Sequence, residues 1–557
     1  MFNDLIKDIT GEASPDEAIS PKEKRGCSFF HVWIQEKEDY KMKKRLFAGF
    51  LAVCMAASLA ACGGSTDSTS DTSDSSSDDA SEDGGSSSSE VTDEEITLTY
   101  WHYEDETTID LLAEAFMEKY PNITVETKVI EDMSTDLSAA AAAGEFPDVF
   151  QGTDSDTALA NMYWLDISDY LENDPETANL MPTIEEYGIG RFDTDAWYAM
   201  PMYYSPSAVF IDRNVIDKLN LTMPDTDWTW DEMIQLIKDA TVDDRTGMKY
   251  YGLGYYNRLD SLYGIAACSP EERAIKGEFG FNGEDFDLSY WAVGEQEFSD
   301  LKLGGYVAPQ SDTQEMEDWC GDWSGWCGST GHVAVFSEGF WTYMNIWGVD
   351  GYEEENGLDI VPYVTPNVID EKEHNIIATM YMGGVSTSCE HPYEAYLLLK
   401  FMGWGIDGWN KRIEIYGDTS ITNSSGVALK NSNMPMPVTL DEGVWEGYKS
   451  LFPAYIEQDE EKMAYWDAYF DSVTRPVPYG WYSIAGYWNF CDQYFNSIGI
   501  HDLVDNGTAK AADYVEEATR QANYYHAEAM LSYFGPDGYD VLSDEDIEKY
   551  QAVVDSF

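Results

Sequence analysis

The sequence predicts an α/β protein, and three observations support that prediction. Between residues 95 and 150 the pattern alternates strand, helix, strand, helix, strand, as in a parallel sheet with covering helices. A second α/β section begins near residue 208. The chain has 557 residues, of which 43% are hydrophobic, so it can bury sizeable cores. Its length favours two or three domains over a single one.

The first section contains three strands and two helices, recognised by their hydrophobic periodicity. Apolar and polar side chains alternate in the strands, whereas apolar side chains follow one stripe in the helices. In chain order these elements span 95–100, 107–120, 123–129, 135–143 and 148–150. Ligands bind beyond the carboxyl ends of parallel strands, so residues 101–103 and 151–154 form a candidate binding edge.

The second section has longer connections between its elements. Beyond about residue 435 the pattern is mainly helical and rich in Tyr and Trp, and Ser543 opens a final helix with a capping-box pattern. The elements before that point are strands at 208–211, 331–336 and 379–386 and helices at 228–240 and 392–402.

Charge and motif spacing argue against several classes of function. The formal net charge of -72 repels phosphate backbones, which argues against nucleic-acid binding. The seven histidines form no HxH or HExxH group and no two cysteines form a CxxC pair, so we expect no metal and no cofactor. Cys320 and Cys327 are close enough in the chain for a local disulfide, with two free thiols as the alternative.

Residues 42–61 have the pattern of a lipoprotein signal peptide. Basic residues 43–45 precede an apolar run that is too short to span a membrane, and the segment ends in LAAC. This ending resembles the bacterial lipobox, so we expect Cys62 to be lipidated and to become the mature N-terminus. The alternative is an ordinary cleaved signal followed by an incidental cysteine. Residues 1–41 lack secretory character, and we expect them to be a gene-model extension that precedes the initiator Met42.

The segment that follows Cys62 is expected to be a disordered tether. Residues 62–94 are almost entirely Ser, Asp, Thr, Gly and Glu, which bury nothing and repel one another. The folded part would therefore begin near residue 95, outside the cytoplasm. A lipid at Cys62 would anchor it to the bacterial cell membrane without spanning the bilayer.

Eight segments of the folded part follow one another in the order of a known family. They are ITLTYWHYEDET, AEAFMEKYPNITVET, FPDVF, WLDISDYLEND, AMPMYYSPSAVFIDRNVIDKLNL, DWTWDEMIQLIKDAT, GHVAVFSEGFWTYMNI and MGGVSTSCEHPYEAYLLLKFM. Together they cover most of 95–410 and resemble the family 1 extracellular solute-binding proteins of ABC importers, which include the maltose-binding-like receptors. Beyond about residue 410 the chain is longer and more aromatic than is usual in that family.

The resemblance implies a two-lobe periplasmic-binding-protein-like fold of type II, with hinged lobes and a ligand cleft between them. Lobe 1 would comprise 95–204 plus 378–435, and lobe 2 would comprise 205–377 plus 436–557. The expected function is to capture a carbohydrate, and more narrowly an oligosaccharide, and to deliver it to the permease subunits of an ABC importer. We expect a monomer without enzymatic activity, in which the ligand stabilises the closed state by contacting both lobes.

Sugars present apolar C–H faces to aromatic rings and hydroxyl groups to polar side chains, which defines the candidate site. Trp341 matches the position at which the family stacks a tryptophan on the sugar, with a core tryptophan as the alternative. Asp154 follows the third strand, where its carboxylate is a candidate to hydrogen-bond the ligand, with a helix N-cap as the alternative. The full set of candidate ligand-binding residues is Trp101, Tyr103, Asp105, Asp154, Tyr203, Tyr204, Trp341, Tyr381, Gly383 and Trp481.

Three other functions remain possible from the sequence. A peptide or polyamine receptor could use the same fold, and the many acidic groups would suit a cation. A lipid-anchored glycoside hydrolase would need two carboxylates facing each other across a sugar, although no GxSxG or P-loop motif is present. A surface adhesin for glycans is disfavoured by the absence of repeats.

Overall fold

The computed structural model describes residues 91–557, except 153–154, 246, 257, 268–275, 368–375 and 432–433. The expected gene-model extension, the signal peptide, Cys62 and nearly all of the tether lie outside the described residues. Among the described helices, none has both the length and the hydropathy that a membrane span requires. Cys320 and Cys327 are both free thiols.

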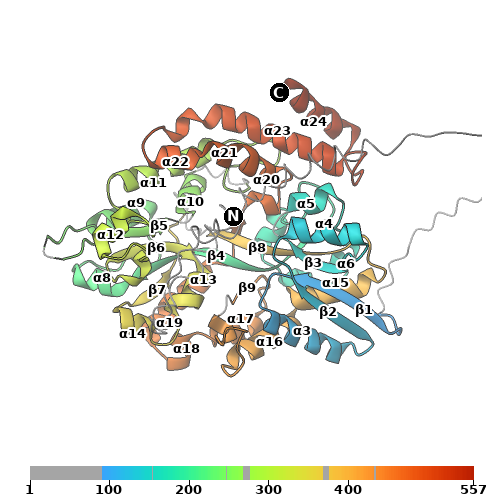
Figure 1. The fold of residues 1–557 in the computed structure, drawn as a ribbon, viewed down its shortest axis with the longest axis horizontal. Coiled ribbons are helices and arrows are strands. Elements are labelled where there is room, and N and C mark those ends of the chain that lie inside the picture. Colours follow the sequence, from blue (N-terminus) through green and yellow to red (C-terminus); the bar gives the residue numbers. More distant parts are fainter. Residues whose placement is uncertain are drawn as a thin grey trace, which may run out of the picture. The chain divides into compact units, whose positions relative to one another are not determined.

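A ten-stranded sheet runs through the described part of the chain (Figure 1). Its main path has the order β2-β1-β3-β8-β4-β6-β5, with β10 beside β8 and with β7 and β9 beside β4. β1 is parallel to β2 and β3, whereas β8 is antiparallel to β3 and β4. The strands are β1 (Ile96–His102), β2 (Ile123–Val129), β3 (Val149–Gly152), β4 (Met200–Asp212), β5 (Tyr251–Tyr256), β6 (Val333–Gly339), β7 (Ile360–Tyr363), β8 (Ile376–Val385), β9 (Met436–Pro437) and β10 (Pro476–Pro478).

Helices before residue 403 alternate singly with strands from β1 to β3, as the sequence predicts, and follow one another in runs in most later connections. They are α3 (Glu106–Lys119), α4 (Met133–Ala143), α5 (Ser155–Ala160), α6 (Ser168–Glu172), α7 (Pro182–Glu186), α8 (Arg213–Lys218), α9 (Trp230–Asp239), α10 (Leu259–Ala266), α11 (Ser289–Leu303), α12 (Gln314–Cys320), α13 (Phe340–Thr342), α14 (Tyr352–Asn356) and α15 (Pro392–Met402).

The later part of the chain is mainly helical, as predicted. Its α-helices are α16 (Ile406–Gly417), α17 (Glu442–Lys449), α18 (Pro453–Glu457), α19 (Glu460–Ser472), α20 (Tyr487–Phe490), α21 (Asn496–Ile498), α22 (Ile500–Asp505), α23 (Val515–Phe534) and α24 (Asp544–Ser556). Two short 3₁₀ turns used below are η7 (Gly480–Tyr482) and η9 (Ala511–Asp513).

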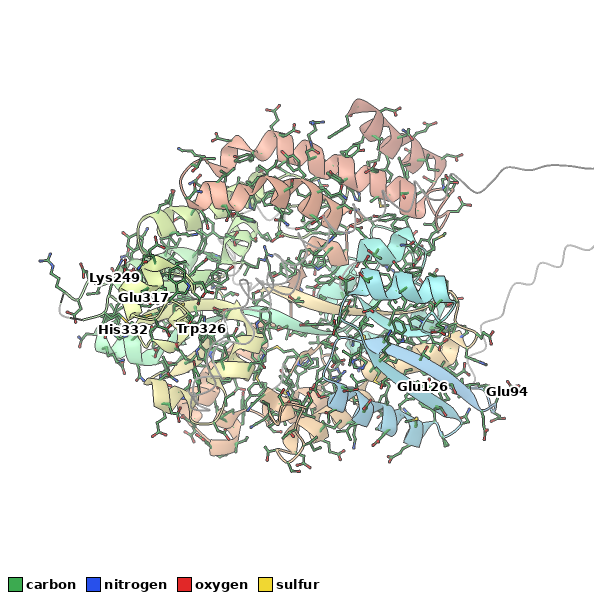
Figure 2. The ribbon with its side chains drawn as sticks, viewed as in Figure 1. Glu94, Glu126, Lys249, Glu317, Trp326 and His332 are labelled. Carbon is green, nitrogen blue, oxygen red and sulfur yellow. The ribbon has the colours of Figure 1, made fainter. Side chains whose placement is uncertain are left out.

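Local chemistry explains the first β-α-β-α-β unit. Asp105 and Asp132 accept backbone hydrogen bonds and cap the N-termini of α3 and α4, and Gly144 ends α4 in the left-handed conformation at φ 72°. On β2, Ile123 is buried whereas Glu126 faces solvent at the outer edge of the sheet (Figure 2). The predicted alternation of strands and helices over this unit is therefore confirmed.

β4 joins two parts of the sheet. Its first half, residues 200–206, pairs with β8, and its second half, residues 207–212, pairs with β6 and β7. All 13 residues of β4 are buried. Burial on both faces removes the alternation of apolar and polar side chains, so the sequence predicted only 208–211 as a strand. β4 and β8 lie in the segments that the family resemblance gives as the two crossings, and β4 is the strand whose pairing reaches both parts of the sheet.

The C-terminal helices contact two helices that lie far apart in the chain, α5 and α11. α23 lies beside α5, whereas α22 and η9 pack against α11 (Figure 1). Asp156 on α5 accepts hydrogen bonds from Gly486 N at 2.8 Å and from Asn489 N at 3.3 Å. Asp505 on α22 accepts a hydrogen bond from Ser299 Oγ on α11 at 2.6 Å. The C-terminal region, which we expected in lobe 2, thus also contacts an element of the expected lobe 1.

Candidate ligand-binding site

Two tyrosines meet where the crossing strands pair. Tyr203 on β4 and Tyr381 on β8 are cross-strand partners, and their ring centroids lie 4.6 Å apart with an interplanar angle of 30°. Tyr203 is buried, whereas Tyr381 is half-buried. The pair therefore offers one partly exposed aromatic ring that is supported from behind by a second ring.

A buried polar network supports this tyrosine pair. Tyr203 OH donates to Gln151 Oε1 at 3.4 Å, and the backbone N–H of Tyr103 donates to the same oxygen at 3.0 Å. Gln151 Nε2 in turn donates to Glu104 Oε1 at 2.9 Å. Burial and then the Glu104 carboxylate raise the pKa of the Tyr203 hydroxyl well above its usual value, so this hydroxyl remains protonated.

Arg412 holds the network from α16. Its Nη1 and Nη2 donate to the two oxygens of Glu104 at 2.6 and 3.0 Å, and Nη2 also donates to Met402 O at 2.7 Å. The guanidinium lies 5.3 Å from the centroid of the Tyr203 ring. Arg412 is fully buried, so this bidentate pair fixes the loop after β1 against α16.

Trp341 lies at the start of the segment that follows β6. The side chain is half-buried, and its indole folds back over Gly339. A Cβ added at Gly339 would lie only 2.1 Å from two ring carbons of Trp341, so the position of this indole requires glycine. Glu338, the preceding residue, is buried, and burial raises the pKa of its carboxyl to about 8.

A third aromatic group lies in the C-terminal part of the chain. The rings of Tyr479 and Trp481 stack with centroids 4.4 Å apart and an interplanar angle of 10°. Arg258 Nε donates to Tyr479 OH at 3.2 Å, while its Nη1 pairs with Glu278 Oε2 at 2.7 Å. Trp481 is half-buried and meets the exposed Trp488 edge to face at 5.6 Å. Rings and polar groups thus occur side by side, as sugar recognition requires.

Strand register relates this third group to the tyrosine pair. β10 is parallel to β8, with Pro476 opposite Ile376 and Pro478 opposite Ala378. The chain leaves β10 directly into η7, which contains Trp481. Because parallel strands advance together, the register carries Trp481 toward the level of Tyr381.

Two predicted residues near β1 have other partners, and a third lies outside the described part. Lys128 Nζ lies 3.5 Å from the ring centroid of Trp101, so that ring faces a lysine. The Asp105 carboxylate accepts a hydrogen bond from Thr108 N at 3.2 Å and thereby caps α3. Asp154 is not among the described residues.

Two predicted residues on the crossing strands are directed into the core. Tyr204 is fully buried, and its hydroxyl donates to Val473 O at 2.9 Å. At Gly383, a Cβ would lie 2.4 Å from Met202 Sδ and 2.8 Å from Leu399 Cδ1, so side-chain packing already fills the space that glycine leaves. Glycine at this position allows β8 to pack closely against Met202 of β4 and Leu399 of α15.

Several polar residues of this region were missed by the sequence reasoning. Gln151 lies in the segment that was predicted as a binding edge, and that placement was the available signal. Glu104 and Arg412 are 308 residues apart in the chain, and Arg258 and Glu278 are 20 apart. No motif joins such residues, so only the tertiary structure brings them together.

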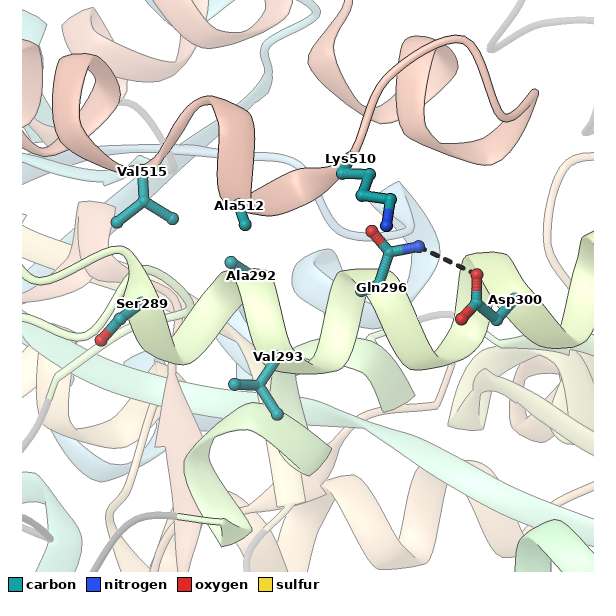
Figure 3. A pocket seen from close by; sticks show the side chains of 8 residues that line it. All are labelled: Ser289, Ala292, Val293, Gln296, Asp300, Lys510, Ala512 and Val515. Carbon is teal, nitrogen blue, oxygen red and sulfur yellow. Dashed lines mark hydrogen bonds between the residues drawn. The ribbon is translucent and has the colours of Figure 1, made fainter.

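Two surface pockets lie elsewhere in the described part. One lies between α11 and the start of α23, and no aromatic side chain lines it (Figure 3). The other surrounds Trp197 and Arg191, between α6 and the start of β4. Neither pocket contains a predicted ligand-binding residue. The residues that line the pocket in Figure 3 are Ser289, Ala292, Val293, Gln296, Asp300, Lys510, Ala512 and Val515.

The arrangement defines a two-lobed α/β protein, in which β4 joins two halves of a sheet and two tyrosines stack where β4 pairs with β8. Residues 101–403, more than half of the chain, match the bacterial extracellular solute-binding proteins. The chain belongs to this family. Because the family consists of binding proteins rather than enzymes, the sequence-based identification of a non-enzymatic solute-binding protein is confirmed.

Solved structures share the same fold at low sequence identity. A sugar transporter of Rhizobium etli in an open conformation is similar with a TM-score of 0.56 at 17% identity, covering 76% of this chain and 98% of its own. The sugar-binding protein MalE of Xanthomonas citri has a TM-score of 0.54 at 14% identity, covering 78% and 98%. An ABC substrate-binding protein of Listeria monocytogenes in complex with cycloalternan has a TM-score of 0.53 at 17% identity, covering 77% and 98%. No curated protein matches the sequence.

Proposed function

We propose that this chain is a lipid-anchored extracytoplasmic receptor that captures an oligosaccharide and delivers it, as a monomer, to an ABC importer. One observation supports a carbohydrate as the ligand: partly exposed aromatic rings come from three separate segments around β4 and β8. These rings are Tyr381 on β8, Trp341 after β6, and Trp481 in η7. Aromatic faces of this kind suit the apolar C–H faces of sugars.

The spacing of these rings supports an oligosaccharide over a single sugar. Gly339, two residues before Trp341, pairs with Ser207 on β4. Ser207 lies four residues along β4 from Tyr203, which pairs with Tyr381. Four strand residues span about 13 Å at a rise of ~3.3 Å per residue. That distance is longer than one pyranose ring, so two ring-stacking positions would hold different sugar units.

The same geometry supports capture by closure. Tyr381 belongs to the half of the sheet that contains β1 and β3, whereas Trp341 follows β6 in the other half. A ligand that contacts both rings has a higher affinity for the state in which the two halves are close, and so it shifts the population toward that state. An importer that recognises the closed state would then receive only loaded receptors.

Calorimetry tests whether the ligand is a carbohydrate. A soluble form of the protein that begins after Cys62 is titrated with a panel of oligosaccharides. At least one saccharide should bind, and Trp341→Ala should weaken that binding about tenfold or more, since buried aromatic anchors contribute strongly to affinity. Trp323→Ala is the matched control, because Trp323 is an exposed tryptophan outside the aromatic groups of the candidate site. An unchanged affinity in Trp341→Ala would remove this residue from the site.

The alternatives give different results in a thermal-shift screen with saccharides, a peptide pool and spermidine. A shift with spermidine or peptides, and none with saccharides, would favour the peptide or polyamine receptor. The lipid anchor is tested separately by Cys62→Ser, which should release the protein from the membrane fraction and remove the lipid mass from its N-terminal peptide.

A further inference from the structure

Three side chains with metal-ligating atoms converge at the junction of α10, α11 and α22. Asp260, Glu295 and His501 each offer one ligand atom, and these atoms lie within 4.8 Å of one another. His501 Nδ1 lies 2.8 Å from Glu295 Oε2, although the two residues are 206 positions apart. Asp260, Glu295 and His501 are not part of the aromatic groups described above.

Close helix packing creates the cluster. Gly294 on α11 faces the backbone of α10 so closely that a Cβ there would lie 1.6 Å from Asp260 O. Gly264 on α10 is in the same position toward α11, since its Cβ would lie 2.1 Å from Tyr290 O. Two glycines therefore let the helices approach at the level of Asp260 and Glu295, which forces two carboxylates into one small buried space.

The carboxylates are buried and incompletely satisfied. Asp260 is 5% exposed and Glu295 is 2% exposed, and Glu295 Oε1 is buried with no hydrogen-bond partner. A buried carboxylate oxygen without a partner is strongly unfavourable. The unpartnered oxygen of Glu295 is therefore an acceptor that a cation could satisfy.

The nearby Arg258 supplies positive charge to this cluster only in part. Arg258 donates from Nη1 to Glu278 Oε2 at 2.7 Å, so its single positive charge is matched by a separate carboxylate. Asp260 also interacts electrostatically with Arg258, so among the described residues the two carboxylates have His501, which carries at most one positive charge, and an arginine that is already paired with Glu278. A divalent cation would neutralise both carboxylates and leave the histidine neutral, as a metal ligand must be.

We propose that Asp260, Glu295 and His501 bind a divalent transition-metal ion, with Zn²⁺ as the best match. An imidazole nitrogen with two carboxylate oxygens suits zinc, whereas calcium prefers six to eight oxygen ligands. The side chain of His501 is 40% exposed, which gives the ion a path from solvent. The rings of Phe495 and Trp291 lie against the imidazole at 5.0 and 6.2 Å and hold its orientation. The ion would fasten α22 to α10 and α11, a role separate from solute capture.

The expectation of no metal came from the absence of HxH and HExxH groups. Those motifs detect ligands that share one helix or strand. Here the ligands come from three helices, and each is a single residue in its own segment. Sequence spacing could not reveal such a site.

The test is a titration of the chelator-treated protein with Zn²⁺, followed by calorimetry and thermal melting, with cysteines alkylated. We expect one tight site per chain and a rise in the melting midpoint. Glu295→Gln and His501→Ala should each weaken zinc binding at least tenfold and abolish the zinc-dependent rise. Asp300→Asn, which changes an exposed carboxylate on α11, should leave both unchanged.

Glu295→Gln also separates ligation from a purely structural role. Without metal, this variant should melt at the same or a higher temperature than the unaltered protein, because one of two repelling charges is gone. Zinc binding that is absent from the unaltered protein, or that persists in both ligand variants, would overturn the proposal. Saccharide calorimetry without zinc tests the solute site independently, so either proposal can fail alone.

Discussion

At the scale of single residues, Gly339 controls where the indole of Trp341 can lie. Its backbone has φ -63°, which alanine adopts readily, so Gly339→Ala introduces no backbone strain. The new methyl group would instead occupy the space of the Trp341 ring and displace it. We expect Gly339→Ala to weaken saccharide binding about three- to tenfold, equivalent to ~0.7–1.4 kcal/mol, by calorimetry.

Gly417→Ala is the matched control for this prediction. A Cβ at Gly417, the last residue of α16, would meet only Leu451 Cδ2 at 3.6 Å, an ordinary contact. This variant should bind saccharide as tightly as the unaltered chain. If both variants bind equally well, the position of the Trp341 ring does not matter for binding.

Glu338 predicts a dependence of stability on pH. Burial raises the pKa of this carboxyl to about 8, above its value in the unfolded chain. Between the unfolded and folded pKa values the native state holds a proton that the unfolded state has lost, so stability falls as the pH rises from about 5 to 8. Glu338→Gln removes this titration. Urea midpoints of the variant and the unaltered protein, compared at pH 5, 7 and 8.5, should therefore diverge in favour of the variant as the pH rises.

Strand geometry separates two neighbouring residues of the predicted site. Adjacent residues of a strand point to opposite faces, so Tyr203 and Tyr204 could not both meet the ring of Tyr381. The structure stacks Tyr203 on Tyr381 and directs Tyr204 into the core. Whether Tyr203 or Tyr204 faces Tyr381 depends on the pairing of β4 with β8, and no residue next to the two tyrosines in the sequence specifies that pairing.

At the scale of elements, the buried pair of Arg412 and Glu104 fastens α16 to the loop after β1. Glu104→Gln would leave the fully buried guanidinium without a carboxylate. Breaking such a pair from one side costs about 3 kcal/mol or more. We expect a fall of that size in the free energy of unfolding, measured by urea titration with intrinsic fluorescence.

The surface pair Lys119–Asp407 is the internal control, since it also joins the α3 region to α16. Its atoms lie 2.6 Å apart, but its side chains are 46% and 64% exposed. Exposed ion pairs contribute about 0–1 kcal/mol, so Asp407→Asn should change the free energy of unfolding by less than ~1 kcal/mol. If Glu104→Gln and Asp407→Asn lowered the free energy of unfolding equally, burial would not explain the contribution of the Arg412–Glu104 pair.

Element prediction was most accurate where periodicity is strongest. β1, α3, β2, α4 and β3 agree with the predicted segments because each has one buried and one solvent-facing side, apart from the short buried β3. Only residues 208–211 of β4 were predicted as a strand, because β4 is buried on both faces. β9 and β10 were not predicted, since two or three residues carry no period.

At the scale of the whole molecule, the net charge of -72 dominates the electrostatics. Like charges repel more strongly in the compact state than in the extended chain, and salt screens that repulsion. Raising sodium chloride from 10 to 100 mM shortens the screening length from about 30 Å to about 10 Å. The urea midpoint should therefore rise with salt, and potassium chloride should give the same rise. A fall in the midpoint would mean that attractive ion pairs outweigh the repulsion.

The sequence by itself determined the order of the first five elements, the family and the expected export and anchoring, because each rests on residues that are neighbours in the chain. Hydrophobic period, capping residues and a signal pattern are all local properties. Only the tertiary structure decided which side chains meet. The pairs Tyr203–Tyr381, Glu104–Arg412 and Glu295–His501 join distant segments. Such contacts depend on strand register and helix approach, which are properties of the packed molecule and leave no local pattern in the sequence.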